Sequence, residues 1–170
     1  MKKALVVIDM QNDFIDGSLG TPEAKAIVLS VSEKVKKALD EGVKVIFTQD
    51  THHGDYLSTA EGKKLPVEHC IKPSHGWALA TPLIPFAKDA VVLEKSVFGA
   101  AGLSSLVSDC DEITLAGLCT DICVIVNAML IKTFLPEATL RVYSSACAGT
   151  TPESHVRALE AMKMCQIEIL

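Results

Sequence analysis

Short apolar runs alternate with longer amphipathic stretches along the chain. The runs are rich in Val, Ile and Leu and show no regular polar alternation, which favours strands that are buried on both faces. We predict strands at residues 4–8, 43–47, 91–93, 113–116 and 140–143, with 166–170 as a further strand at the end of the chain.

Residues 22–40 have the pattern of an amphipathic helix. Apolar residues recur there at helical spacing from Ala26 to Leu39, and Gly42 marks the end of the helix. We predict further helices at 121–134 and 152–164, with a shorter one near 101–107. Because strands and helices alternate, we expect one α/β domain over residues 1–170, with a doubly wound, mainly parallel sheet of about five or six strands and helices on both faces.

The stretch from Asp50 to Pro85 interrupts this alternation. It contains four prolines and three glycines and has no strong periodic pattern of its own. A connection of this length in a compact domain usually carries function. We therefore expect it to contribute residues to a functional site.

Composition and charge narrow the class of protein. A hydrophobic content of 49% indicates a globular chain, and a net charge of −5, with Lys and Arg never more than two in a row, disfavours nucleic acid and anionic membranes as partners. The apolar run at the start stops at Asp9 without a cleavage-site pattern, so we expect a cytoplasmic protein. The six cysteines are scattered, which favours free thiols over disulfides.

Polar residues stand just after several predicted strands. In an open parallel sheet, ligands bind outside the carboxyl ends of the strands. Asp9, Asp50 and Lys95 follow the first three predicted strands, and the segment from Cys119 to Cys123 follows the fourth. Each residue alone is weak evidence, since an Asp after a strand is often a turn residue and a lone Lys is often on the surface. Their convergence on one edge predicts a site.

The segment GLCTDICV suggests a reactive cysteine. Thr120 or Asp121 is a candidate helix cap, which puts Cys123 in the first helical turn, where the helix dipole favours a thiolate. Cys119 competes for the same role, and spacing does not separate the two cysteines. The competing interpretation is that Cys123 is a small, buried, unreactive residue.

Two charged residues would complete such a site. A nearby Lys95 would lower the pKa of the thiol further, and Asp9 would accept its proton and later deliver it to a leaving amine. These roles predict a nucleophilic hydrolase.

Asp50, His52 and His69 form a second candidate group. One carboxylate and two imidazoles suit a catalytic divalent metal site with open positions. On spacing alone, a pair of surface histidines is an equally good interpretation, because His53 and His75 stand nearby.

Three motifs together resemble one family. VIDMQNDF, EKSVF and GLCTDICV occur in this order over essentially the whole chain and are similar to those of the isochorismatase-like cysteine hydrolases, in particular the nicotinamidase/pyrazinamidase branch. The resemblance implies that Cys123 is the nucleophile and that Asp9 and Lys95 are its acid/base partners. It also implies a cis peptide between Leu118 and Cys119, which would aim the backbone N–H groups of Cys119 and Cys123 at an oxyanion.

The resemblance also implies metal ligands and substrate contacts. The branch carries ligands at positions that match Asp50, His52 and His69, and we expect Glu61 as a further ligand, with Asp55 as the alternative. The metal would be zinc, with iron or manganese as alternatives. We expect Phe14 and Leu118 to contact the substrate, and Trp77 is a weaker candidate for the same role.

The resulting hypothesis is an amidohydrolase that converts nicotinamide to nicotinate and ammonia through a Cys123 thioester. Alternatives are a relative that acts on another small amide, a carbamoyl compound or isochorismate, and a non-catalytic thiol sensor in which Cys119 and Cys123 pair reversibly. The expected partners are a small-molecule amide and further copies of the chain in a homo-oligomer.

Overall fold

Six parallel strands in the order β3-β2-β1-β4-β5-β6 form the centre of the computed structural model, which describes residues 1–170. The strands are β1 (Lys3–Ile8), β2 (Lys44–Asp50), β3 (Val91–Lys95), β4 (Glu112–Leu118), β5 (Thr139–Ala148) and β6 (Glu168–Ile169). The predicted α/β class with a parallel sheet is confirmed. Most strands run further than the apolar runs suggested; β2, for example, continues through Thr48 and Gln49 to Asp50.

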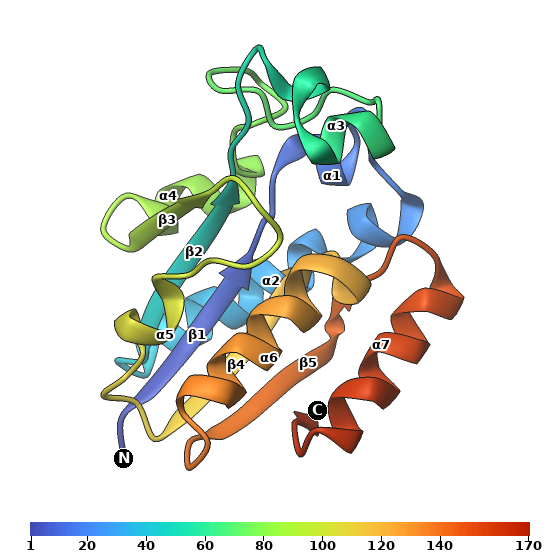
Figure 1. The fold of residues 1–170 in the computed structure, drawn as a ribbon. Helices are drawn as coiled ribbons and strands as arrows, with labels where there is room; N and C mark the ends of the chain where they lie inside the picture. The colour runs from blue at the N-terminus through green and yellow to red at the C-terminus, as the bar shows by residue number, and fades with distance from the viewer.

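Helices cover both faces of the sheet (Figure 1). One face packs against α1 (Asn12–Ile15), α2 (Pro22–Asp40) and the 3-10 turn η2 (Thr81–Leu83), and the other packs against α5 (Leu103–Leu106), α6 (Ile125–Phe134) and α7 (Pro152–Met164). Each face of the sheet has its own hydrophobic core, and alternate residues of β1 pack into one or the other. Leu5 and Val7 face α2, while Val6 and Ile8 face α6. No helix is both long enough and apolar enough to cross a membrane.

Local sequence signals explain the ends of the two longest helices. Thr21 caps α2 by accepting a hydrogen bond from the backbone N–H of Ala24, and Thr151 caps α7 together with Ser154. Both helices have proline in the first turn, and both begin and end at the predicted residues.

The segment from Asp50 to Pro85 lies above the carboxyl ends of β1 and β2 (Figure 1). It contains the 3-10 turn η1 (Tyr56–Ser58) and the helix α3 (Ala60–Lys64), and α4 (Ile84–Ala87) begins near its end. Along the chain, β2 and β3 are added on one side of β1, and β4, β5 and β6 are added on its other side. The carboxyl ends of β1 and β4 therefore flank the topological switch point, where α/β folds bind their ligands.

Candidate active site and metal centre

Lys95 is the centre of a buried charge cluster. Its Nζ lies 2.7 Å from Asp9 Oδ2 and 3.0 Å from Asp50 Oδ1, and its side chain is 2% exposed. The same nitrogen is 3.5 Å from the sulfur of Cys123. The side chains predicted to converge at the sheet edge are therefore in contact.

Asp9 is held at the end of β1 with a positive φ of 44°. The Thr48 hydroxyl donates a 2.6 Å hydrogen bond to Asp9 Oδ1 and accepts the backbone N–H of Asp9 at 3.2 Å. Burial raises the pKa of Asp9, and the neighbouring Lys95 ammonium opposes this rise only in part. A carboxylate with a raised pKa is a stronger base towards a nearby thiol.

Cys123 lies in a π-helical turn, Thr120–Val124 (η3), that precedes α6. The peptide bond between Leu118 and Cys119 is cis, as predicted. Burial and the Asp9 carboxylate raise the pKa of the Cys123 thiol well above its usual value, and Lys95 opposes them. The expectation of a lowered thiol pKa is therefore wrong, because desolvation and the Asp9 charge outweigh the effect of Lys95 on this pKa. A raised pKa favours the protonated sulfur, which would then need a base to become a nucleophile.

The prediction of a side-chain cap for this helix is also wrong. The residue at the N-cap of the turn is Cys119, and no side-chain hydrogen bond caps it. The Thr120 hydroxyl instead lies 2.8 Å from His155 Nδ1 on α7, and the Asp121 carboxylate accepts hydrogen bonds from the backbone and hydroxyl of Thr150. The helix expected from residue 121 consequently divides into η3 and α6.

Asp50, His52 and His69 form a buried group, the metal-ligand cluster, whose candidate ligand atoms all lie within 4.8 Å of one another. Asp50 Oδ2 is 3.0 Å from His52 Nε2 and 3.7 Å from His69 Nε2. His69 Nδ1 donates to the Val67 carbonyl at 2.8 Å, which leaves Nε2 free to bind a metal in the neutral ring. The surface-histidine interpretation does not hold, because both rings are buried.

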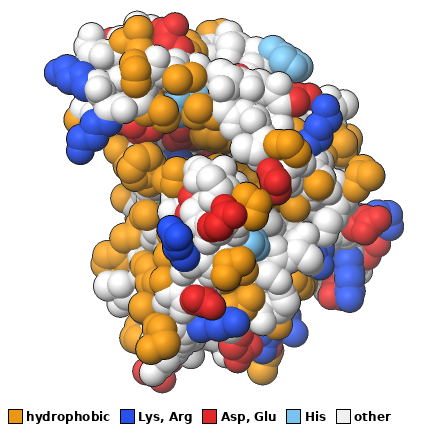
Figure 2. Space-filling view, turned by 90° about the vertical axis from the view of Figure 1, so that its right-hand side faces the viewer, with side chains coloured by type: hydrophobic (Ala, Val, Ile, Leu, Met, Phe, Trp, Pro, Cys, Tyr) orange, Lys and Arg blue, Asp and Glu red, His pale blue; other side chains and the backbone are white.

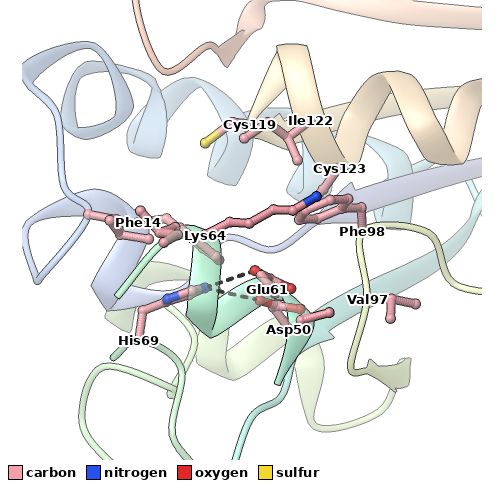
Figure 3. Close-up of a pocket in the computed structure, with 13 residues that line it drawn as sticks. Phe14, Asp50, Glu61, Lys64, His69, Val97, Phe98, Cys119, Ile122 and Cys123 are labelled. Carbon is pink, nitrogen blue, oxygen red and sulfur yellow. Dashed lines mark ion pairs between the residues drawn. The ribbon is translucent and has the colours of Figure 1, made fainter. Parts of the chain in front are cut away.

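Glu61 approaches the same cluster from α3. Its Oε1 lies 3.9 Å from His52 Nε2. The same oxygen lies 3.7 Å from His69 Nε2 (Figure 3). Asp55 is exposed and pairs with neither histidine, so the geometry favours Glu61 over this alternative.

A cavity of about 430 Å³ joins the sulfur to the metal-ligand cluster. Cys119 and Cys123 line one side, and Asp50, Glu61 and His69 line the other (Figure 3). Most of the remaining lining residues are hydrophobic, and in the space-filling view the surface is hollowed beneath the upper part of the molecule (Figure 2). A small apolar molecule with a polar group would fit such a site.

Comparison with known proteins gives a family. The model of the isochorismatase domain matches residues 3–170. This chain belongs to the isochorismatase family.

Named members of the isochorismatase family match over the full length. The chain is 30% identical to an isochorismatase-family protein of Bacillus subtilis, over 94% of this chain and 93% of that protein. It is 27% identical to a nicotinamidase/pyrazinamidase of Mycobacterium tuberculosis, over 99% of this chain and 98% of the relative. The crystal structure of the Pyrococcus horikoshii pyrazinamidase in complex with zinc superposes with a TM-score of 0.88, at 27% identity and over 100% and 99% of the two chains.

Within this isochorismatase-family site, the predicted substrate-contact residues have different positions. Phe14 lines the cavity, and its ring centroid lies 5.6 Å from that of His69. Leu118 does not line the cavity, because its side chain is fully buried in the core. Trp77 does not line it either, and its indole N–H donates to the Thr51 hydroxyl.

Sequence reasoning missed several residues of the isochorismatase-family site. Thr48 bonds to Asp9, Gln11 bonds to the backbone of Asp50, and Lys64 and Phe98 line the cavity. The signal that could have found Thr48 is a polar residue at the end of a buried apolar strand, close before Asp50. Lys64 had no signal beyond its place in the long 50–85 segment.

Proposed function

We propose that the protein is an amidohydrolase that converts nicotinamide to nicotinate and ammonia through a thioester on Cys123. The observation that carries the proposal is the contact of Lys95 with both Asp9 and Cys123, beside a cavity that the metal-ligand cluster also borders. The full-length similarity to a nicotinamidase/pyrazinamidase supports the choice of substrate.

In the first half-reaction, Asp9 accepts the thiol proton while the sulfur of Cys123 attacks the amide carbon. The backbone N–H groups of Cys119 and Cys123 hold the oxyanion. The Lys95 ammonium lies 2.7 Å from Asp9 and 3.5 Å from the sulfur of Cys123. It therefore stabilises the negative charge while that charge moves between the carboxylate and the sulfur. Asp9 then gives the proton to the amide nitrogen, the C–N bond breaks, and ammonia leaves a thioester behind.

In the second half-reaction, water replaces the sulfur. Asp9 takes a proton from water as the water oxygen attacks the thioester carbon. The C–S bond then breaks, the acid is released, and Asp9 returns the proton to the sulfur of Cys123.

The metal-ligand cluster fits a divalent ion. One carboxylate and two imidazoles match catalytic zinc sites, and the Val67 carbonyl already orients one of the rings. A bound ion would supply a Lewis acid for the ring nitrogen of nicotinamide. We expect zinc, with iron or manganese as alternatives, and Glu61 as a further ligand. Phe14 would pack against the pyridine ring.

The test is ammonia release from nicotinamide by metal-loaded protein. Cys123→Ala is expected to abolish release, whereas Cys119→Ala keeps measurable activity because its backbone N–H remains. Loss in Cys119→Ala with retention in Cys123→Ala would reverse the assignment. Release from other small amides but not from nicotinamide would contradict the substrate and retain the mechanism.

A further inference from the structure

The Gln11 side chain extends the pairing of β1 with β2. Regular pairing between these strands ends at Val7 and Phe47. Beyond it, Gln11 Oε1 accepts the backbone N–H of Asp50 at 2.7 Å, and Gln11 Nε2 donates to the Asp50 carbonyl at 2.8 Å. The buried amide thus offers Asp50 the donor and acceptor of a neighbouring strand, and it fixes where the Asp50 carboxylate stands.

A second glutamine, Gln49, directly precedes Asp50 and shares part of this network, but its side chain makes no hydrogen bond to Asp50. Gln11 Nε2 also donates to the Trp77 carbonyl at 2.8 Å, and Gln49 Nε2 donates to the same oxygen at 2.9 Å. Both side chains are buried. Gln49 is therefore a matched control that separates the support of Asp50 from the support of the Trp77 loop.

Asp13 supports the other metal-ligand segment. Its Oδ2 accepts the backbone N–H of Cys70 at 2.7 Å, directly after His69. Cys70 has a φ of 49°, in the left-handed region, and its carbonyl accepts the N–H of His52 at 3.0 Å. A Cβ at Gly76 would come within 2.1 Å of Asp13 Oδ2, so glycine is what lets this carboxylate approach.

We propose that Gln11 and Asp13 are positioning residues for the metal-ligand cluster: Gln11 fixes Asp50, and Asp13 fixes the segment that carries His69. This inference rests on the proposed function only in taking the cluster as a metal site. Both residues belong to the segment that follows Asp9. One short stretch therefore carries the base and supports the ligands opposite it. Removal of such outer contacts typically weakens metal binding by about 10- to 100-fold.

The first experiment compares Gln11→Met with Gln49→Met. Zinc affinity is measured by competition with a chromophoric chelator, with the unfolding temperature of each variant recorded alongside. We expect Gln11→Met to bind zinc at least about tenfold more weakly than wild type, and Gln49→Met to stay within about threefold. Equal losses in the two variants would overturn the role of Gln11. If Gln11→Met does not fold, Gln11→Glu, which retains the acceptor but loses both donors, takes its place.

The second experiment compares Asp13→Asn with Asn12→Ala. Asn12 also bonds to the backbone of this loop, donating to the His75 carbonyl at 2.8 Å, but its side chain makes no hydrogen bond to the segments that carry the candidate ligands. We expect weaker zinc binding in Asp13→Asn and near-normal binding in Asn12→Ala. Wild-type affinity in Asp13→Asn would overturn the role of Asp13.

Excess metal separates positioning from chemistry. Saturating zinc is expected to restore the kcat of Gln11→Met to within a few-fold of wild type, whereas Cys123→Ala stays inactive. Weakened zinc binding without any nicotinamide hydrolysis would defeat the proposed substrate and leave this inference standing. Nicotinamide hydrolysis together with unaltered zinc binding in the variants would support the proposed substrate and overturn this inference. If the wild-type protein binds no zinc, both the metal site and this inference are overturned.

Discussion

Asp9 is completely buried, and the proposed mechanism gives it the role of proton acceptor. Burial raises its pKa above the ordinary value of 3.8, although Lys95 opposes the rise. Only ionised Asp9 can take the thiol proton, so kcat/KM is expected to fall as the pH drops through this raised pKa. A pH–rate profile with nicotinamide, with circular dichroism to confirm that the protein stays folded, measures it. An acid limb at or below pH 4 would contradict the assignment.

Lys64 is the only lysine or arginine that lines the cavity, and its side chain lies across it without an ion-pair partner (Figure 3). In the proposed reaction the product, nicotinate, is an anion, whereas the substrate, nicotinamide, is neutral. We expect Lys64→Met to raise the inhibition constant of nicotinate about two- to fivefold, the range of an exposed ion pair, with little change in KM for nicotinamide. Product-inhibition kinetics measure this.

Lys63 provides the control for that substitution. It is adjacent in α3 and exposed, but it does not line the cavity. Lys63→Met should leave nicotinate inhibition unchanged, and an equal effect of both variants would indicate a general surface-charge effect instead.

Among single residues, the charged residues of the site could be predicted from the sequence, whereas the residues that hydrogen-bond to them could not. Asp9, Asp50 and Lys95 follow from a general rule about the carboxyl ends of parallel strands. The bonds of Thr48 to Asp9 and of Gln11 to Asp50 join residues 39 positions apart, and no local pattern encodes such a contact.

The helix α3 carries both Glu61 and Lys64 into the cavity, and Gly62 between them sets its distance from η1. A Cβ at Gly62 would lie 2.1 Å from the carbonyl oxygen of Tyr56. Gly62→Ala is expected to lower stability by about 1–3 kcal/mol through overpacking and to weaken zinc binding, because Glu61 shifts. Chemical denaturation and chelator competition measure the two effects.

Gly54 gives the matching control in the same segment. An added Cβ there meets no atom within 4 Å. Gly54→Ala should therefore change neither stability nor zinc binding appreciably, and a loss equal to that of Gly62→Ala would contradict the packing argument.

The two long helices were predictable because their caps and prolines are local in sequence. The π-helical turn at Cys123 was not, because its polar residues bond to α7 and to the residues just before it. Thr120 pairs with His155, and Asp121 pairs with Thr150. Locally, Thr120 and Asp121 resemble helix-cap residues, but their side chains hydrogen-bond instead to a segment that lies far along the chain.

For the whole molecule, a metal that binds only the folded state must raise its stability. Free zinc at about 100 times its dissociation constant adds about 2.7 kcal/mol, which for a chain of this size corresponds to a rise in Tm of roughly 5–10 °C. Thermal unfolding with zinc and with chelator measures the rise. His69→Ala should remove most of it, and an equal rise in that variant would place the ion elsewhere.

The sheet class was predictable because all six strands lie within a pattern of apolar runs and intervening helices. That pattern does not determine the strand order, because the order depends on which face each crossover covers. The order places β1 and β4 side by side, and with them Asp9 at the end of one strand and Cys123 beyond the end of the other.

Asp50 gives one carboxylate oxygen to Lys95 and the other to the histidines. Under the proposed function, this sharing constrains divergence. A descendant without the metal would keep the carboxylate, because Lys95 still pairs with it. A descendant without the carboxylate would lose charge balance beside Cys123. New substrate preferences should therefore arise first at residues such as Lys64 and Phe98, which border the cavity and belong to neither cluster.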